Sequence, residues 1–385
     1  MELTPVLENI EKRLGQYISI NAEDRATKLY VSQLTREHLR KTISFFLTIS
    51  ADQEPVPFQD VGTGTLNTLV LALLSFIAEV KKDNVIFAME EPEIALPPHT
   101  QRRIANYLLN ETTQCFVTSH SPYVIEQFGS DQIQILQRNE SAEVTAIPVS
   151  QGSLKDKIYK RYARRGLAEA MLGAGVIVVE GITEQSAIRA VAEKLEESNA
   201  ALYPLDLSGI SIFPVDGDGS LPMFGAFFKN LGLRSYAFYD FKKRKDEENQ
   251  KFVESFDLPN EIPYTGMEKL LATELPLYRQ WQFLCELVQS GEQGSIGIPS
   301  ERPSDEQVSL ILMNALKSNK GNSYAGRIIG LCDSQEMPVS IVSFLTQVYA
   351  DFPRPRPIKY EQQEFNEIVD FDGETESAEH PKEGE

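Results

Sequence analysis

The chain has 385 residues, a hydrophobic fraction of 42% and a formal net charge of −19. That length is enough for two domains, each with its own core, and the hydrophobic fraction argues against disorder over most of the chain. No stretch approaches the ~20 apolar residues that span a bilayer, and the N-terminus has neither the basic start nor the apolar run of a signal peptide. We therefore expect a cytoplasmic protein that does not enter a membrane.

The cysteines and the distribution of charge exclude further classes of protein. The three cysteines are odd in number and far apart, which predicts reduced, buried thiols and neither a disulfide framework nor a zinc site. From Glu361 to Glu385 there are ten acidic residues against Lys382 alone, so this tail supplies nearly half of the net charge. We expect the tail to be disordered, and the acidity of the whole chain does not exclude nucleic acid as a partner.

The first third of the chain has the pattern of an α/β domain. Up to about Phe128, the apolar runs KLYVS, NVIFAME and CFVTS alternate with helical stretches, the clearest of which spans Leu66 to Lys82. Alternation of this kind predicts a parallel sheet. A polar, weakly periodic stretch from Gln127 to Gly166 then connects to the next unit.

A second α/β domain follows, and beyond Pro259 the pattern becomes helical. The predicted strands are GVIVVEG, ISIFPVDGDG and SYAFYDF, separated by helices at Glu184–Glu197 and Leu221–Leu231. The later helices are predicted at Asp305–Lys317, with Ser304 as N-cap, at Ser323–Cys332 and at Val339–Tyr349. Three prolines between 353 and 357 end regular structure.

Three motifs in the first domain resemble the later half of an ABC-type ATPase. They are VGTGTLN before a helix, the adjacent Glu90 and Glu91 at a strand end, and VTSHSPYVI, which places His120 after another strand. The resemblance implies that the signature loop contains Gly62, Thr63 and Gly64 and holds a γ-phosphate across a dimer interface. It also implies that Glu90 orients magnesium, Glu91 polarises the attacking water and His120 senses the phosphate. Each motif alone also fits a turn, a solvated loop or a helix cap.

The phosphate-binding loop that these motifs require does not occur in the sequence. No G-x-x-x-x-G-K-[ST] pattern is present. We therefore expect an ATPase module whose N-terminal lobe was trimmed, lost in evolution or supplied by another polypeptide. On this interpretation the chain alone binds ATP poorly, and ATP is a cofactor only of a completed ATPase domain.

Acidic residues also follow the strands of the second domain. Glu180 ends one apolar strand and Glu184 lies in the first turn of the next helix, while Asp216, Asp218 and Asp240 follow later strands. If the strands are parallel, all of them meet at one edge of the sheet. Like charges ~4 Å apart repel by roughly 4 kcal/mol at an effective dielectric constant near 20, so this cluster calls for a cation or raised pKa values. Magnesium or manganese suits such ligands, although a D-G-D-G turn is also common in ordinary loops.

The motif V-E-G-x-T-E after a strand, followed by acidic strand ends, resembles a Toprim domain. Joined behind an ABC-type half, it resembles the OLD (overcoming lysogenisation defect) family of ATP-dependent nucleases, which includes the nuclease of the Gabija anti-phage system. The resemblance covers about Val56 to Leu331. It implies a homo-oligomer, a dimer or larger, that cuts or nicks DNA with two metal ions and acts in phage defence or DNA processing.

The resemblance assigns roles to individual residues. Glu180 and Glu184 match the opening glutamates, and Asp240 matches the first acid of the D-x-D motif. The implied metal ligands are Glu180, Glu184, Asp216, Asp240 and Glu268, and the implied catalytic residues are Glu180 and Lys320. Lys320 resembles the lysine that the family places opposite the metals.

One position departs from the family pattern. Lys242 stands where the second D-x-D aspartate is expected, inside the basic run KKRK that ends at Lys245. Either Asp218, Asp246 or Glu268 compensates, or the site holds one firmly bound ion, or the domain is degenerate and no longer cuts. The basic run itself is either a solvated loop or a contact for a phosphate backbone.

The sequence therefore predicts a protein of five parts. These are an ATPase half at 1–128, a connector at 129–170, a Toprim domain at 171–258, a helical extension at 259–352 and a disordered tail at 353–385. The leading hypothesis is a metal-dependent DNA endonuclease whose further partner is a separate N-terminal ATPase lobe or a helicase-like protein. A non-catalytic regulatory subunit is the alternative. Topoisomerase and primase chemistry is less well supported, because no tyrosine stands out as a nucleophile and no zinc motif is present.

Overall fold

The computed structural model describes most of the chain in nine stretches. These are residues 4–17, 27–31, 43–48, 54–81, 86–112, 114–138, 141–199, 205–319 and 323–352. Lys320 and the predicted disordered tail lie outside the described residues. Within them, no helix is long and apolar enough to cross a membrane.

The first sheet of the N-terminal part is antiparallel. It contains β1 (Thr27–Val31), β2 (Ile43–Leu47) and β3 (Val56–Pro57), in that order. The parallel arrangement predicted for this part is therefore wrong for these strands. The physical reason is chain length, because a parallel connection needs a crossover of a dozen or more residues and only residues 32–42 separate β1 from β2.

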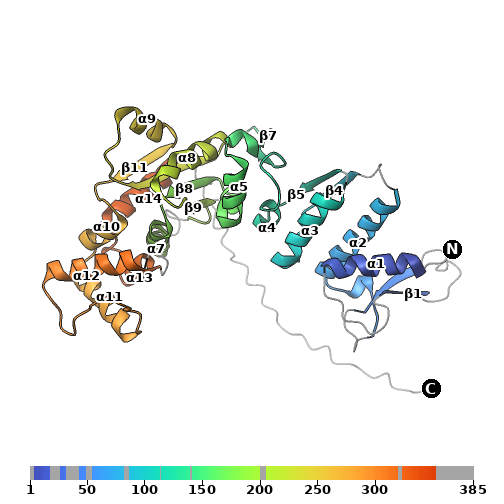
Figure 1. Ribbon diagram of the computed structural model, residues 1–385, viewed down its shortest axis with the longest axis horizontal. Helices are drawn as coiled ribbons and strands as arrows, with labels where there is room; N and C mark the ends of the chain where they lie inside the picture. The colour runs from blue at the N-terminus through green and yellow to red at the C-terminus, as the bar shows by residue number, and fades with distance from the viewer. Residues whose placement is uncertain are drawn as a thin grey trace, which may run out of the picture. The chain divides into compact units, whose positions relative to one another are not determined.

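The second sheet of the N-terminal part is parallel, as predicted. It pairs β4 (Ile86–Glu90) with β5 (Gln114–Thr118) through the crossover helix α3 (Pro98–Glu111). The helix α2 (Thr63–Lys81) lies near its predicted place, and α1 (Thr4–Tyr17) packs on it through Ile10 and Leu14 (Figure 1). Apolar side chains of α2, α3 and the segment between β4 and α3 form a small core against this sheet, consisting of Leu71, Leu96, Ile104, Tyr107 and Leu108.

The stretch predicted as a connector contains regular structure. A short helix, α4 (Pro122–Ile125), precedes an antiparallel hairpin of β6 (Gln134–Arg138) and β7 (Val144–Pro148). After it come α5 (Asp156–Tyr162), the π-helical turn η4 (Ala163–Leu167) and the short α6 (Ala168–Ala170). The chain kinks inside η4 where Gly166 takes a φ of 99°, a conformation that glycine adopts without strain.

The second α/β domain is built on a parallel sheet of four strands in the order β11-β10-β8-β9. The strands are β8 (Gly175–Val179), β9 (Ile210–Pro214), β10 (Arg234–Asp240) and β11 (Leu258–Ile262). The first three match the predicted strands. Every residue of β8 is buried, as expected for a central strand with both faces covered.

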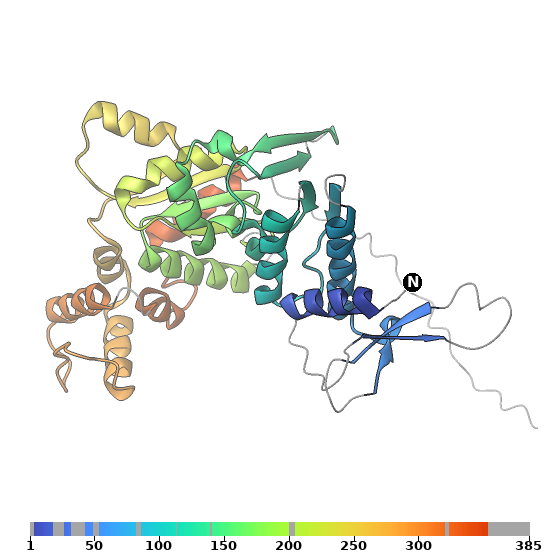
Figure 2. The same ribbon diagram turned by 45° about the vertical axis from the view of Figure 1, so that its right-hand side comes forward.

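Alternate residues of β8 enter two different cores. Ile177 and Val179 pack with α7 (Ile182–Asn199) on one face, whereas Val176 and Val178 pack with α5 and α8 (Leu221–Asn230) on the other. Figures 1 and 2 show α7 and α8 on opposite sides of this sheet. Tyr159 of α5 is fully buried in the second core, so this helix is anchored to the sheet.

The predicted helical region is confirmed. Its helices are α10 (Met267–Glu274), α11 (Leu277–Gln289), α12 (Asp305–Ser318), α13 (Tyr324–Gly330) and α14 (Val339–Asp351). The helix α9 (Asp246–Glu254) precedes this region and was not predicted. Ser304 is the N-cap residue of α12, although its side chain makes no capping hydrogen bond. Apolar side chains of α10 to α14 extend the core on the α7 side of the sheet.

Candidate functional site

The carboxyl ends of the parallel strands bring acidic residues to one edge of the sheet. β8 ends immediately before Glu180, and β10 ends at Asp240. The turn after β9 is tied to the end of β8, because the Gly217 amide donates a hydrogen bond to the Glu180 carbonyl at 2.9 Å. This edge is the usual ligand-binding edge of open α/β sheets.

Glu184 and Asp240 share this edge with Glu180 and Glu268. Burial raises the pKa of Glu184 to about 7, and the negative charges of Asp240, Glu180 and Glu268 add to the effect. Burial likewise raises the pKa of Asp240 to about 6, assisted by the charges of Glu180 and Glu268 and opposed by Lys242. Four of the five predicted metal ligands therefore act on one another electrostatically.

Gly266 leaves room for two of these carboxylates. Glu268 lies in the first turn of α10 and is buried, with Gly266 as the N-cap residue at a φ of 147°. A Cβ atom at position 266 would lie 2.7 Å from Glu268 Oε2 and 3.9 Å from Asp240 Oδ2. A side chain there would intrude between the two carboxylates, so the glycine belongs to the site although no sequence motif indicated it.

Asp216 has different neighbours. It takes a left-handed φ of 54°, and its Oδ2 lies 2.5 Å from Arg165 Nη1 and 3.6 Å from Arg161 Nη2. Asp218, two residues later, faces Lys242 and Arg244 instead, with its Oδ2 3.3 Å from Lys242 Nζ and its Oδ1 2.9 Å from Arg244 Nη2. The structure therefore separates the two aspartates of the D-G-D-G turn.

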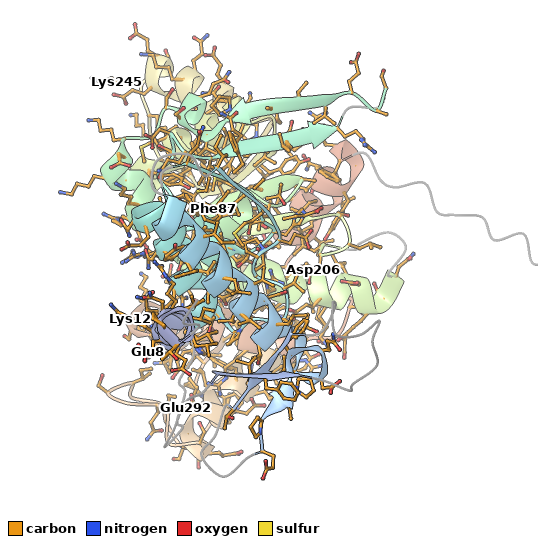
Figure 3. All side chains as sticks on the ribbon, turned by 90° about the vertical axis from the view of Figure 1, so that its right-hand side faces the viewer. Glu8, Lys12, Phe87, Asp206, Lys245 and Glu292 are labelled. Atoms are coloured by element: carbon orange, nitrogen blue, oxygen red, sulfur yellow. The ribbon has the colours of Figure 1, made fainter. Side chains whose placement is uncertain are left out.

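Lys242 is held among the carboxylates. Its Nζ lies 3.4 Å from Glu180 Oε2 as well as 3.3 Å from Asp218 Oδ2. Burial acts to lower the pKa of Lys242, but the attraction of Glu180 and Asp218 outweighs it, so the pKa is raised and the ammonium stays charged. Lys245, which precedes α9, lies at the surface (Figure 3).

The donor chemistry of the edge fits a hard divalent cation. All the gathered ligands are carboxylate oxygens, which magnesium and manganese prefer. Glu184 and Asp240 form no ion pair with any described residue, so a cation would relieve the repulsion that raises their pKa values. As the side chains stand, no three Asp, Glu, His or Cys residues in the described ranges are arranged closely enough to hold a metal. Binding would therefore require the carboxylates to close around the ion.

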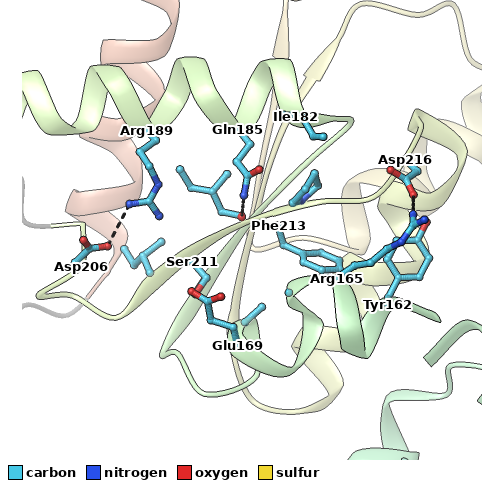
Figure 4. A pocket seen from close by; sticks show the side chains of 15 residues that line it. Tyr162, Arg165, Glu169, Ile182, Gln185, Arg189, Asp206, Ser211, Phe213 and Asp216 are labelled. Carbon is cyan, nitrogen blue, oxygen red and sulfur yellow. Dashed lines mark hydrogen bonds and ion pairs between the residues drawn. The ribbon is translucent and has the colours of Figure 1, made fainter. Parts of the chain in front are cut away.

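A cavity of about 540 Å³ lies beside this edge, along the outer strand β9 (Figure 4). Its two ends carry the ion pairs of Arg165 with Asp216 and of Arg189 with Asp206. Between them, Gln185 of α7 donates a hydrogen bond to the Ile212 carbonyl at 2.9 Å, which satisfies an acceptor of the edge strand. The gathered carboxylates do not line this cavity.

The predicted nucleotide-associated residues of the N-terminal part lie at the carboxyl ends of β4 and β5. Glu90 ends β4, and Glu91 follows with a left-handed φ of 42° that allows its amide to donate to the Thr118 carbonyl at 2.9 Å. His120 Nε2 lies 3.8 Å from Glu91 Oε1. The strand-end acids and the histidine are therefore close together.

Two further contacts join the loops around these residues. Glu93 Oε1 accepts hydrogen bonds from Ser119 Oγ and from the His120 amide, both at 2.8 Å, and so fixes the histidine loop to the acidic loop. A Cβ atom at Gly64 would lie 2.5 Å from the Ala95 carbonyl oxygen, so only glycine lets the start of α2, where Gly62, Thr63 and Gly64 lie, approach this loop. The sequence reasoning missed Glu93, although the third acid of EEPE was a visible signal.

Comparisons with known proteins agree with this two-part arrangement. Residues 2–125 match the model of a AAA ATPase domain, and residues 171–241 match the model of the Toprim domain of overcoming lysogenization defect protein-like proteins. The fold and the acidic sheet edge thus define the class, an ATPase region of AAA/ABC type followed by a Toprim domain with a helical C-terminal region. The chain is therefore similar to proteins of the OLD family.

Two relatives are similar at low identity. The chain is 22% identical over 316 residues to the Old nuclease of Escherichia phage P2, and the matched region covers 77% of this chain and 49% of that protein. It is 22% identical over 203 residues to endonuclease GajA of Bacillus cereus (strain VD045), which covers 51% of this chain and 34% of that protein. The chain thus spans half or less of these relatives. The C-terminal region of the Burkholderia pseudomallei OLD protein is 15% identical, with a TM-score of 0.33, over 46% of this chain and 98% of that structure.

Proposed function

We propose that this chain is a metal-dependent DNA endonuclease or nickase whose centre lies at the carboxyl edge of the Toprim sheet. The observation that carries the proposal is the gathering of Glu180, Glu184, Asp240 and Glu268 there, with the pKa values of Glu184 and Asp240 raised. Magnesium or manganese held by these carboxylates would activate water and stabilise the leaving oxygen of a phosphodiester. The protein's own part is to hold the carboxylates, of which Glu184 and Asp240 are the principal candidates. A role in phage defence or DNA processing rests on the family resemblance alone.

A basic segment supports DNA as the substrate. From Lys155 to Arg165 the chain carries six exposed cations and only one acid, Asp156, although the whole protein has a net charge of −19. Arg161 and Arg165 reach Asp216, just past the end of β9, so this segment adjoins the sheet edge that holds the carboxylates. Cations placed in this way can neutralise phosphates of a DNA backbone on its path to the metal centre.

The test is the conversion of supercoiled plasmid to relaxed or linear product with magnesium, with manganese and with EDTA. We expect product only with a divalent ion, and Glu184→Gln is expected to abolish it. Glu193→Gln is the matched control, because Glu193 is an exposed residue on the same helix. Absence of product with either ion, from folded protein, would favour the regulatory alternative. The specific observation behind that alternative is the lysine at position 242.

Lys320 remains a proposed catalytic residue that lies outside the described part of the chain. Its polar, glycine-containing surroundings are typical of a loop between helices, and an ammonium there would suit the charge that develops on a phosphate oxygen. We expect Lys320→Ala to slow nicking by roughly 10²–10³-fold. Lys317→Ala, in the last turn of α12, is the control. Unchanged nicking in Lys320→Ala, or a loss matched by a lower melting temperature, would remove Lys320 from the centre.

We propose that the ATPase region hydrolyses ATP only when it is completed by a phosphate-binding loop, which this sequence lacks. Two observations support this: the sequence has no such loop, and one face of the β4–β5 sheet is open, with Ile86 62% and Phe116 63% exposed. A parallel sheet normally has both faces covered. The chain alone should therefore hydrolyse ATP at background rate, whereas turnover abolished by Glu91→Gln would contradict the proposal. Assembly as a homo-oligomer is proposed because signature loops of this type act across a subunit interface.

A further inference from the structure

The acidic residues at the Toprim edge divide into two groups by their cationic partners. Glu180 and Asp218 contact Lys242 at 3.4 and 3.3 Å, and Asp218 also contacts Arg244 at 2.9 Å. Glu184 and Asp240 are partly buried and make no ion pair with the described residues. One side of the centre is thus already neutralised by the chain, while the other side still needs a positive charge.

The Lys242 ammonium is held by a supported network. Arg244 fixes Asp218, and its own guanidinium lies 5.0 Å from the ring centre of Tyr239 and 4.2 Å from that of Phe252. It also contacts Glu261 Oε1 at 3.1 Å. Because the arginine side chain is largely buried between two rings and two carboxylates, Asp218 is a fixed anchor for Lys242. The Lys242 side chain, which is 43% exposed, is thus directed by two carboxylates, one of which is itself fixed by Arg244.

A divalent ion and an ammonium cannot share the Glu180 and Asp218 oxygens without strong repulsion, since both carry positive charge. An ammonium can nevertheless serve one purpose of a metal ion, because a compact positive charge attracts a phosphate oxygen. It differs from a metal in that it is always present and requires no binding from solution.

We propose that Lys242 takes the place of a second metal ion, so that the centre binds one divalent ion, on the side of Glu184 and Asp240. The Lys242 ammonium, positioned by Glu180 and Asp218, supplies the second positive charge to the phosphate. This inference rests on the proposed nuclease function and specifies its metal requirement. It also explains how the edge keeps a carboxylate cluster although the second D-x-D acid is a lysine.

The experiment counts bound manganese in the full chain without DNA, by electron paramagnetic resonance of free Mn²⁺ and by calorimetry. We expect one ion in the unmodified protein and a second ion in Lys242→Asp. Lys251→Asp is the matched control, because it makes the same charge change at an exposed lysine of α9, and it should still bind one ion. Lys242→Arg, which keeps the positive charge, should also bind one.

The possible results separate this inference from the proposed function. Two ions in the unmodified protein, or one ion in a folded Lys242→Asp, would overturn the inference and leave the nuclease proposal intact. No bound ion in the unmodified protein would overturn both. If Lys242→Asp does not fold, as judged by circular dichroism, Lys242→Ala replaces it: a second ion there supports the inference, and a single ion overturns it.

Discussion

The two regions of this protein both place acidic residues at the carboxyl ends of parallel strands. They differ in how far the faces of the sheet are covered. In the Toprim domain, β8 is buried on both faces and its neighbours supply the remaining carboxylates of the edge. In the ATPase region, β4 and β5 are covered on one face, and Ile86 and Phe116 are exposed on the other. The Toprim edge gathers its proposed ligands within one domain, whereas the ATPase motifs come together without a phosphate-binding loop in the sequence.

This difference shows why a motif alone does not define an activity. Glu90 and Glu91 stand at the end of β4, and His120 Nε2 lies 3.8 Å from Glu91 Oε1. We propose that they act on a nucleotide only when a phosphate-binding loop completes the region, since the sequence has none. The proposed function of the Toprim carboxylates requires only an ion from solution.

The largest expected effect is the loss of nicking in Asp240→Asn, which removes a charge from the centre of the Toprim edge. We expect a decrease of roughly 10²–10³-fold, measured on supercoiled plasmid with manganese. Asp246→Asn is the control, because Asp246 lies in the exposed first turn of α9 and the structure gives it no contact with the cluster. Equal losses in both variants would show that the edge is not the site of cleavage.

A second prediction concerns the stability of the metal-free protein. The pKa of Glu184 is about 7 in the folded state, against an ordinary value of 4.5, so the folded protein binds the extra proton between these values. The free energy of unfolding should therefore decrease as the pH rises from about 4.5 to 7, by an amount of order 1–3 kcal/mol. Glu184→Gln should reduce this decrease to the part that Asp240 contributes, whose pKa of about 6 acts in the same direction, and should melt higher than the unmodified protein at pH 8.

Added magnesium gives the complementary measurement. It should raise the melting temperature of the unmodified protein at pH 8 and have a smaller effect on Glu184→Gln. Glu193→Gln is the control, and it should keep the pH dependence of the unmodified protein. If Glu184→Gln and the unmodified protein show the same pH dependence of the melting temperature in EDTA, then the pKa of Glu184 is not raised by burial as the structure indicates.

The basic segment provides a third test, on substrate binding without cleavage. Lys157 and Arg164 are exposed and form no ion pair with described residues, so the double change to alanine should weaken DNA binding without altering the fold. For every phosphate that is no longer neutralised, the log–log slope of affinity against salt concentration should decrease by about one unit. The assay is fluorescence anisotropy in EDTA, with Lys251→Ala as the control. An unchanged salt slope would exclude this segment from the DNA path.

The smallest effect on stability is expected for a substitution on the exposed face of the β4–β5 sheet. Phe116→Ser should change the stability of the isolated chain by less than about 0.5 kcal/mol, because the side chain is 63% exposed. Phe87→Ser, on the covered face of the same sheet, should cost roughly 3 kcal/mol or more. A large loss in Phe116→Ser would mean that this face is already covered, and the contrast between the two regions would fail.

The sequence determined the strands and helices that carry the chemistry. Apolar runs ending in acidic residues located β4, β8 and β10, and the order of the motifs indicated both domains and the OLD resemblance. These signals are local, because a buried strand requires consecutive apolar residues and a ligand edge follows where it ends. Edge strand β11 was not predicted, since its sequence LPNEI lacks a continuous apolar run.

Only the tertiary structure decided which side chains meet at each edge. Asp216 has a left-handed φ, and its carboxylate contacts Arg165, 51 residues earlier in the chain. The carboxylate of Asp218 contacts Lys242 instead. Glycine at 266 keeps the space between Glu268 and Asp240 open. Spacing along a sequence places residues at a strand end, but the direction of a side chain after that point depends on backbone dihedrals and on partners from distant segments. The position of the Lys242 ammonium could therefore be read only from the folded domain.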